Sequence, residues 1–458
     1  PPCRKISATV IWRRDLVRRL NALMNGQKVG VLEKLRGGGM AFRYDEEWLK
    51  SSLRRPVSLS MPLSSRPYTG NEVYNYFDNL LPDNPSVRKR VMAKFSVEVD
   101  HPFDILRAIG HDCVGALQLV TDAFQYQPKI DAEPLSEQDV ARQLRQYQDS
   151  PLGMDGEDDF RISLAGVQEK TALLFHEGQW LRPFGATPTT HILKLPVGII
   201  QNASGNIDLS GSCDNEWTCL EFIRNMGIPT ANAAVATFED QRVLVVERFD
   251  RRWAADEKWL LRLPQEDFCQ AMNLPSSKKY QADNGPSILD CMRLLQGASD
   301  NFTDRLKFLK TQIMFLLLSA PDGHAKNFSV FLQAGDNFAL TPVYDVISIY
   351  PINNKQLHHR AKLAMGWMGT SKGYRYKLQA VQLRHILFTA KKLGLLQEVE
   401  AFIGDISSTV ESAIISTEKA AKAQEIDMTI ALPILEKTRA KGDWLGASMI
   451  DARHLGGF

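Results

Sequence analysis

The pattern of apolar and polar residues predicts a small mixed domain over residues 20–125. Two apolar stretches flank Asn25-Gly26, a pair typical of a hairpin turn, and GGGMAFRYDEEWL continues the same sheet. Further along, apolar residues recur at helical spacing. EVYNYFDNLLPDN therefore predicts a helix that stops at Pro82, and PSVRKRVMAKF predicts a second helix that starts near Pro85.

A polar stretch poor in large apolar residues marks the domain boundary, and we expect residues 126–159 to form a linker with one short helix. Strand-like runs such as THILKLP and QRVLVVERFDRRW then predict a strand-rich lobe over residues 160–260. The pattern becomes mostly helical over residues 261–440. We expect residues 441–458 to be a loose tail, and we assign no role to the arginine-rich basic extension of residues 1–19.

The composition is that of an ordinary globular protein, since 44% of the 458 residues are hydrophobic and 24% are charged. The 55 basic and 53 acidic residues give a formal net charge of +2, so any contact with nucleic acid needs a local patch. Six scattered cysteines without a CxxC pair argue against a zinc site and a disulfide framework. The longest apolar runs are far shorter than the roughly 20 residues that span a bilayer. We therefore expect a cytoplasmic protein without membrane contact.

The densest polar chemistry lies between Ser319 and Val346, directly behind the apolar run IMFLLL. Asp, His, Lys and Asn side chains crowd into the short segment DGHAKN, and Asp345 follows at the end of LTPVYDV. Two acidic residues and one carboxamide at the ends of apolar elements suit a divalent cation and a phosphate ester. We interpret this stretch as the chemical centre.

Lys194 lies among apolar residues in the strand THILKLP, where an unpaired charge is costly. Its ammonium group either reaches solvent at an edge or binds an anion, and Glu216 in the first turn of a following helix is a candidate ion-pair partner. FRISLAGVQEK is a weak candidate for a phosphate-binding loop, with a plain hairpin as the alternative. The charged exit at Glu247 is either a hinge that contacts a flat ring or an ordinary strand end.

Lys194, Asp322, Asn327 and Asp345 occur in the order of the functional residues of protein kinases. There a strand lysine holds phosphates, a catalytic Asp faces the substrate hydroxyl, an Asn five residues later binds metal, and a further Asp binds metal. The step from Asp322 to Asn327 is the same. The H-R-D, D-F-G and G-x-G-x-x-G words of protein kinases are absent from the sequence.

The sequence motifs present instead resemble those of the HipA toxin kinases of bacterial toxin-antitoxin pairs. They are FDNLLPDN, FRISLAGVQEK, TTHILKLP, the DNE helix start, VERFDRR, LPQED, DGHAKNFS and YDVIS, in this order. The resemblance runs from about residue 20 to beyond residue 390. It implies a serine/threonine protein kinase of mixed α/β (α+β) class. The implied architecture is a two-lobed, lipid-kinase-like catalytic domain with a helix-rich C-terminal lobe, behind a smaller mixed N-terminal domain.

The resemblance also implies roles for individual residues and the cofactors ATP and Mg²⁺. It implies Asp322 as catalytic base, Asn327 and Asp345 as magnesium ligands, and Lys194 as the phosphate-binding lysine. Ser163 matches the family's autophosphorylated serine. A phosphate there would add nearly two negative charges in the loop for ATP phosphates, and the resemblance implies self-inactivation by ejection of this loop from the site. The further nucleotide-binding positions are Ala165, Gly166, Val167, Gln168, Glu169, Lys170, Glu247, Arg248, Phe249, His324, Ala325, Lys326 and Tyr344.

The implied partners are a small helix-turn-helix antitoxin (HipB-like) dimer, operator DNA bound as a corepressor complex, and a protein substrate, typically glutamyl-tRNA synthetase, whose phosphorylation arrests growth and causes persistence. Tyrosines alternate with the basic residues Lys372, Arg375 and Lys377, which suits either a DNA contact or a solvated strand. Two other functions stay open: a small-molecule kinase of the aminoglycoside or choline type, and a catalytically silent corepressor.

Overall fold

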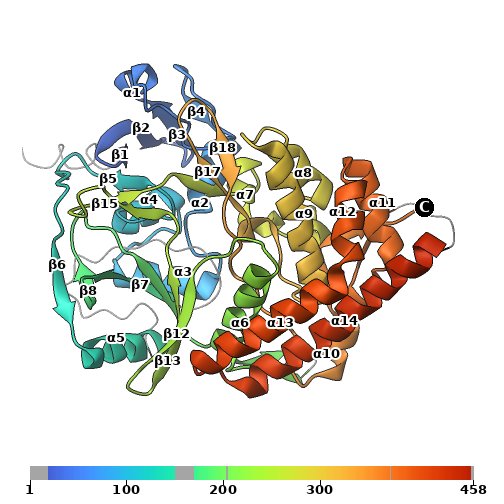
Figure 1. Ribbon diagram of the computed structural model, residues 1–458. Coiled ribbons are helices and arrows are strands. Elements are labelled where there is room, and N and C mark those ends of the chain that lie inside the picture. Colours follow the sequence, from blue (N-terminus) through green and yellow to red (C-terminus); the bar gives the residue numbers. More distant parts are fainter. Residues whose placement is uncertain (1–18, 150–169, 203–204, 372, 455–458) are drawn as a thin grey trace, which may run out of the picture.

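The computed structural model describes residues 19–149, 170–202, 205–371 and 373–454. Its N-terminal domain contains a five-stranded antiparallel sheet in the order β4-β3-β2-β1-β5 (Figure 1). The predicted hairpin turn is confirmed, because Asn25 and Gly26 join the first two strands with φ angles of 48° and 82°. The strands are β1 (Arg19–Met24), β2 (Gln27–Lys34), β3 (Met40–Tyr44), β4 (Tyr68–Thr69) and β5 (Leu117–Val120).

Four helices complete the N-terminal domain: α1 (Glu46–Lys50), α2 (Asn71–Asp78), α3 (Pro85–Lys94) and α4 (Pro102–Ile109). The predicted start of a helix at Pro85 is confirmed, with the Asn84 side chain accepting a hydrogen bond from the Ser86 amide as N-cap. Phe42, Phe77 and Phe103 are fully buried between the sheet and its helices. This domain therefore has a hydrophobic core of its own.

The second sheet has six strands in the order β12-β13-β9-β7-β8-β6. They are β6 (Ala132–Leu135), β7 (Lys170–His176), β8 (Gln179–Pro183), β9 (His191–Lys194), β12 (Ala233–Phe238) and β13 (Gln241–Glu247). The expected linker at residues 126–159 does contain a helix, α5 (Glu137–Asp149), but it also supplies β6, which pairs with β8. Val140 and Leu144 of α5 are buried against the sheet, so the segment is part of this lobe. Its polar composition hid the edge strand.

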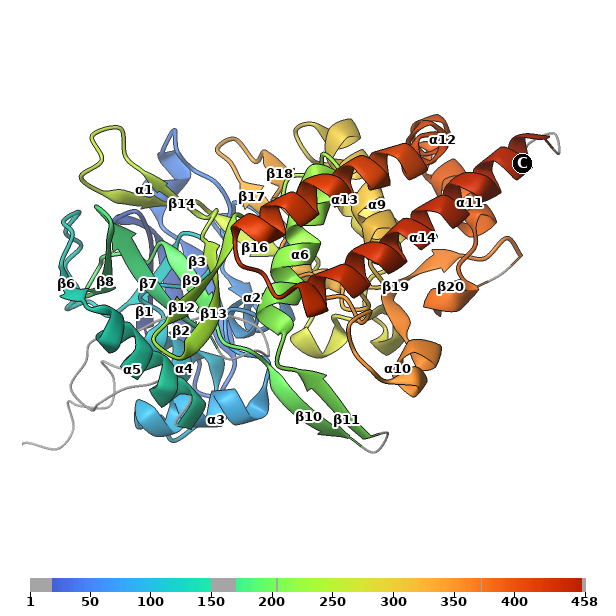
Figure 2. The same cartoon turned by 60° about the horizontal axis from the view of Figure 1, so that its bottom comes forward.

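Helix α6 (Ser212–Asn225) joins the two lobes, because it contacts β12 and β13 on one side and α13 (Ile406–Ala423) and α14 (Met428–His454) on the other (Figure 1). The chain enters α6 through a hairpin of β10 (Gly198–Asn202) and β11 (Gly205–Leu209), which projects from the body of the molecule (Figure 2). The three residues at the start of α6 follow directly from this hairpin and are buried.

The C-terminal lobe is rich in helices, as predicted. Its core surrounds α9 (Asn301–Leu317), whose residues Ile313 to Leu317 are buried. The expected loose tail is instead helical, since α14 continues to His454, and Leu445 and Met449 are buried in the same core. The other elements are β14 (Arg251–Trp253), β15 (Leu260–Arg262), β16 (Gln265–Asp267), α7 (Phe268–Ala271), η1 (Ser276–Lys278), η2 (Gln281–Asp283), α8 (Ile288–Leu295), η3 (Ala325–Asn327), β17 (Ser329–Leu332), β18 (Phe338–Leu340), α10 (Lys355–Arg360), β19 (Lys362–Met368), β20 (Tyr374–Lys377), η4 (Leu378–Ala380), α11 (Leu383–Leu393) and α12 (Leu396–Gly404).

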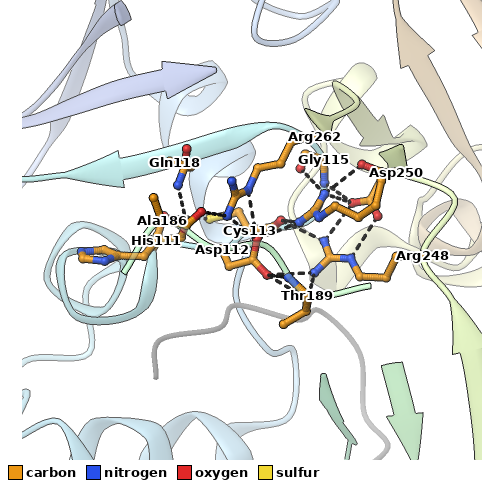
Figure 3. Close-up of polar contacts among 12 residues, drawn as sticks. His111, Asp112, Cys113, Gly115, Gln118, Ala186, Thr189, Arg248, Asp250 and Arg262 are labelled. Carbon is orange, nitrogen blue, oxygen red and sulfur yellow. Dashed lines mark hydrogen bonds and ion pairs between the residues drawn. The ribbon is translucent and has the colours of Figure 1, made fainter. Parts of the chain in front are cut away.

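A buried network of charges joins the N-terminal domain to the strand-rich lobe. Asp112, between α4 and β5, accepts hydrogen bonds from Arg248, Arg251 and Arg262 at 3.2, 2.8 and 3.1 Å (Figure 3). The Arg248 Nη2 also donates to Asp250, at 2.9 Å. Burial alone would raise the pKa of Asp112, but the three guanidinium groups hold it well below its usual range. The two domains are therefore fixed to each other by ionised groups that water does not reach.

Another interdomain contact carries a pH-dependent cost. Glu266 in β16 is fully buried, and its Oε1 accepts a hydrogen bond of 2.7 Å from the Leu59 amide of the N-terminal domain. Burial raises the pKa of Glu266 from its usual 4.5 to about 8. Because the folded state holds this proton more tightly than the unfolded chain, the carboxyl contributes no penalty below pH 4.5 and a growing one as the pH rises to 8.

We therefore expect Glu266→Gln to be more stable than the wild type at pH 8, and no more stable at pH 4.5. The difference in unfolding free energy should widen by up to about 1.4 kcal/mol for each pH unit between these limits. Urea denaturation of both proteins across this range measures it. A constant difference would mean that Glu266 keeps an ordinary pKa in the folded protein.

Candidate active site

The segment after α9 is a tight loop that presents Asp322 to solvent. Asp322 is exposed, whereas the residues from Gly323 to Val330 are buried. Gly323 is required by close packing, because a Cβ atom there would lie 2.3 Å from the Phe315 ring of α9. The His324 amide donates to the Asp322 carbonyl at 2.8 Å and begins the short helix η3. The polar sequence DGHAKN thus places one accessible carboxylate on a rigid support.

Asn327 ties this loop to the segment that carries Asp345. Its Nδ2 donates to the Asp322 carbonyl at 2.8 Å and to the Asp345 carbonyl at 3.5 Å. With the amide nitrogen used in these contacts, the amide oxygen is the group available to a cation. Asn327 therefore closes the loop that starts at Asp322 and holds the backbone of Asp345 against it.

Asp345 has a left-handed backbone conformation with φ of 61°. Such a conformation costs energy for a residue other than glycine, and it places the Asp345 carboxylate beside Lys194, whose Nζ lies 3.0 Å from Oδ1. The Asp345 side chain is 36% exposed. Burial would raise the pKa of Asp345, but Lys194 and Lys170 outweigh it and hold that pKa well below its usual range. Asp345 is thus an ionised carboxylate that solvent partly reaches.

Lys194 binds an anion, which is one of the two possibilities that its sequence left open. Its Nζ donates to both Glu216 oxygens, at 2.7 and 3.0 Å, and the predicted ion pair is confirmed. Lys170 lies directly opposite Lys194 in the antiparallel pair of β7 and β9. Burial, together with the charge of Lys194, lowers the pKa of Lys170 to about 8. Two lysines side by side on one sheet face make an environment that favours an anion.

The DNE start of α6 gives each of its three residues a separate partner. Asp214 accepts hydrogen bonds from Arg242, and Glu216 accepts those of Lys194. Asn215 exchanges two hydrogen bonds of 2.8 Å with the backbone of Ser348, three residues after Asp345. The first turn of α6 therefore fixes Lys194 and the Asp345 segment relative to each other.

The strand exit at Glu247 faces aromatic residues of the helical lobe. The Phe249 ring lies 5.6 Å from that of Tyr344, and the Tyr344 hydroxyl donates to the Lys326 carbonyl at 3.0 Å. The Glu247 side chain is exposed and accepts a hydrogen bond from Asn232. Phe249 and Tyr344 therefore pack against each other at this exit, and their contact with a nucleotide base stays a prediction.

Two of the predicted nucleotide-binding side chains have their partners at the contact with the N-terminal domain. The Arg248 side chain lies in the buried interdomain network, its amide donates to the Thr190 carbonyl, and its carbonyl accepts from the Arg251 amide. The Lys326 Nζ points to the N-terminal domain, where it lies 2.9 Å from both the Asn79 Oδ1 and the Asp83 Oδ1. Both are buried cations that are paired with a carboxylate. The binding of a nucleotide by Arg248 and Lys326 stays a prediction.

Tyr280, which sequence reasoning missed, touches the candidate base directly. Its hydroxyl donates to the Asp322 Oδ1 at 2.6 Å, and its ring packs edge-to-face on His324 at 5.0 Å. Burial and the neighbouring Asp322 raise the pKa of Tyr280, so the phenol stays protonated and acts as a donor. His324 is buried, its Nδ1 has no hydrogen-bond partner among the described residues, and burial lowers its pKa. No sequence motif around Tyr280 indicated this contact.

Several predicted positions lie outside the described residues: Ser163, Ala165, Gly166, Val167, Gln168, Glu169 and Lys372. Ala325 is buried in η3, with its amide donating to the Lys279 carbonyl at 3.1 Å. Arg375 and Lys377 lie in β20, and Lys377 is exposed. The contact of this basic cluster with DNA stays a prediction.

The residues around Lys194 and Asp345 fit a nucleotide with a bound magnesium ion. Asp345 and Asn327 offer a carboxylate and an amide oxygen, and two lysines lie beside them. Among the described residues no group of three or more His, Cys, Asp or Glu is arranged for a metal. Mg²⁺ commonly takes one or two protein ligands and completes its shell with phosphate oxygens and water.

Comparison with known proteins places the chain in a family. Residues 162–414 match the model of the HipA-like C-terminal domain, and residues 20–120 match that of the HipA N-terminal domain. The chain belongs to the HipA family. The relatives of this HipA-family chain include a Sinorhizobium fredii protein named "Putative kinase Y4mE", 33% identical over 338 residues, which are 72% of this chain and 77% of the relative. The Serine/threonine-protein kinase toxin HipA of Shewanella oneidensis is 27% identical over 322 residues, 68% and 70% of the two chains.

The fold of this HipA-family chain is shared with HipA of Shewanella oneidensis MR-1, solved in a complex with HipB and its operator DNA. The two structures superpose with a TM-score of 0.74 over 96% of this chain and 98% of the other, at 23% sequence identity. The predicted mixed α/β, kinase-like fold is confirmed. No described helix has both the length and the apolar character that crossing a membrane requires.

Proposed function

We propose that this chain is an ATP- and Mg²⁺-dependent serine/threonine protein kinase that acts as the toxin of a toxin-antitoxin pair. One observation carries the proposal. Lys194, Asp322, Asn327 and Asp345 come from separate elements and converge in the order of kinase residues, through the contacts of Asn327 with both acidic segments and of Lys194 with Asp345. Relatives named as kinases support it.

Each group has a task that its surroundings allow. Asp322 is exposed and can accept the proton of an incoming serine or threonine hydroxyl, while Tyr280 holds its other side. Lys194 and Lys170 neutralise charge on nucleotide phosphates, and Phe249 with Tyr344 contacts the base. When bound at Asn327 and Asp345, Mg²⁺ would supply charge stabilisation for the phosphates. Positioning and charge suffice for this reaction, because phosphoryl transfer needs little covalent help from the protein.

Regulation and partners complete the proposal. Phosphorylation of Ser163 would add negative charge beside Ala165–Lys170, the candidate phosphate loop, and so oppose ATP binding. We infer a helix-turn-helix antitoxin dimer and operator DNA as partners, since the superposed HipA was solved with HipB and its operator. Glutamyl-tRNA synthetase is the proposed protein substrate, and growth arrest the proposed outcome.

The test is the intact mass of the purified protein before and after incubation with Mg-ATP, followed by location of any added phosphate. We expect the mass of one phosphoryl group, on Ser163, and transfer to added glutamyl-tRNA synthetase. Asp345→Asn should abolish both, because the carboxylate beside Lys194 is then lost. Phosphate found only on small molecules would favour the small-molecule kinase. An unchanged mass from an unphosphorylated, folded sample, without transfer to any added acceptor, would favour the silent corepressor.

A further inference from the structure

The N-terminal domain contacts the catalytic loop itself through one acidic residue. Asp83, in the turn between α2 and α3, is a residue of the word FDNLLPDN. Its Oδ1 lies 2.9 Å from the Lys326 Nζ, and its Oδ2 lies 3.2 Å from the Lys279 Nζ. The side chains of Asp83, Lys326 and Lys279 are only 10%, 5% and 12% exposed. One carboxylate therefore bridges two buried cations of the other domain.

Both cations lie next to groups of the candidate active site. Lys326 is part of η3, immediately before Asn327. Lys279 precedes Tyr280, whose hydroxyl donates to Asp322, and the Lys279 carbonyl accepts the amide hydrogen of Ala325 in η3. Asp83 thus contacts the residue that precedes the candidate metal ligand. It also contacts the residue that precedes Tyr280, the hydrogen-bond partner of the candidate base.

The surroundings leave Asp83 hard to replace. Among the residues that the structure describes, the Lys326 Nζ pairs with two carboxylates, Asp83 at 2.9 Å and Asp267 at the longer distance of 3.8 Å, and it also donates to the oxygens of Asn79. Burial alone would lower the pKa of Lys326, but Asp267 and Asp83 together raise it. Without Asp83, the Lys326 ammonium would be buried beside a single distant carboxylate and would be driven to move.

We propose that Asp83 is a positioning residue for phosphoryl transfer, through which the N-terminal domain holds the loop of Asp322 and Asn327 in its working geometry. The inference deepens the proposed kinase function and rests on it. The N-terminal domain would then influence the reaction indirectly, because Asp83 contacts neither the candidate base nor the candidate metal ligands. Loss of alignment by such a change costs rate rather than nucleotide affinity.

The test compares Asp83→Asn with a matched substitution in the same word, Asp78→Asn. The Asp78 carboxylate is similarly buried and pairs at 2.8 Å with Arg88 inside the N-terminal domain, and Arg88 keeps a second partner in Asp100. We expect Asp83→Asn to lower kcat by about 10- to 100-fold with the KM for ATP nearly unchanged. Asp78→Asn should leave both near their wild-type values, and Asp83→Glu, which keeps the charge, should retain more activity than Asp83→Asn.

Hydrogen–deuterium exchange supplies a readout that does not depend on activity. Peptides that cover residues 322–328 should exchange faster in Asp83→Asn than in Asp78→Asn, because the amide of Ala325 bonds to the Lys279 carbonyl. If Asp83→Asn fails to fold, Lys279→Gln takes its place with the same expectations. Wild-type protein without transfer would defeat the proposed function while exchange still decides this inference. Variants at Asp83 and Asp78 that match in exchange, and in kcat where transfer occurs, would overturn it.

Discussion

Replacing Asp322 with Asn is expected to lower the rate of phosphoryl transfer to protein by about 10²- to 10⁴-fold, the usual worth of a general base. The substitution preserves the shape of the side chain, and the Asn oxygen can still accept the hydrogen bond that Tyr280 donates at 2.6 Å. Because Asp322 is exposed, removal of its charge leaves no buried group unpaired. The variant should therefore fold normally and bind ATP, while an incoming hydroxyl finds no carboxylate to accept its proton.

The measurement is the initial rate of label transfer from ATP, with thermal unfolding of the same samples as a check on folding. Asp336→Asn is a suitable control. Asp336 is exposed in the turn between β17 and β18 with φ of 61°, a conformation that Asn also adopts readily. It should transfer phosphate like the wild type. Transfer by Asp322→Asn at the wild-type rate would exclude Asp322 as the base, and equal losses in both variants would point to a general effect of charge.

The sequence predicted well those features that depend on neighbouring residues. Asn25-Gly26 specifies a hairpin turn and Pro85 a helix start because their backbone preferences act locally. The pairing of Lys194 with Glu216 was one of two alternatives, since a lysine in an apolar strand either binds an anion or reaches solvent at an edge. Asp322, Asn327 and Asp345 indicated a site for a divalent cation and a phosphate ester, because each lies at the end of an apolar element.

The sequence did not predict contacts between segments far apart in the chain. Arg248 and Lys326 lie within motifs that resemble those of the family, and the resemblance suggested that they bind the nucleotide. The Arg248 guanidinium group contacts Asp112 and the Lys326 ammonium group contacts Asp83, and both buried carboxylates lie more than a hundred residues earlier. Composition treats a buried interdomain cation and a phosphate ligand alike, because both need a nearby anion. Only the tertiary arrangement decides which anion it is.

The prediction failed at both edges of the kinase-like region. Polar composition hid strand β6, which is only half-buried, so its alternation is weak, although it completes the six-stranded sheet. Residues 441–458 were expected to be loose because they lie at the chain end, yet Leu445 and Met449 of α14 are buried in the main core. Both segments are held by packing against elements that lie far away in sequence. Tyr280 escaped notice for the same reason.

Replacing Lys194 with Met is expected to remove phosphoryl transfer and also to destabilise the fold by about 3–5 kcal/mol, the cost of breaking a buried ion pair. The Lys194 Nζ is the hydrogen-bond donor to both oxygens of Glu216, whose side chain is only 2% exposed. Burial alone would lower the pKa of Lys194, but Asp345 and Glu216 hold it above its usual value, so the lysine is charged at every pH of interest. Its removal leaves Glu216 buried beside Asp345, with Lys170 as the remaining neighbouring cation.

The double variant Lys194→Met and Glu216→Gln separates the two roles. Since the second change removes the uncompensated carboxylate, stability measured by urea denaturation should recover in part, whereas transfer should stay absent because nothing replaces the ammonium at the phosphates. Lys50→Met is the control for a surface pair: Lys50 and its partner Glu47 are 69% and 84% exposed, so no measurable loss of stability is expected. Recovery of transfer together with stability would show that Lys194 supports only the fold. Wild-type stability in the single variant would show that the ion pair of Lys194 and Glu216 makes no net contribution to the stability of the fold.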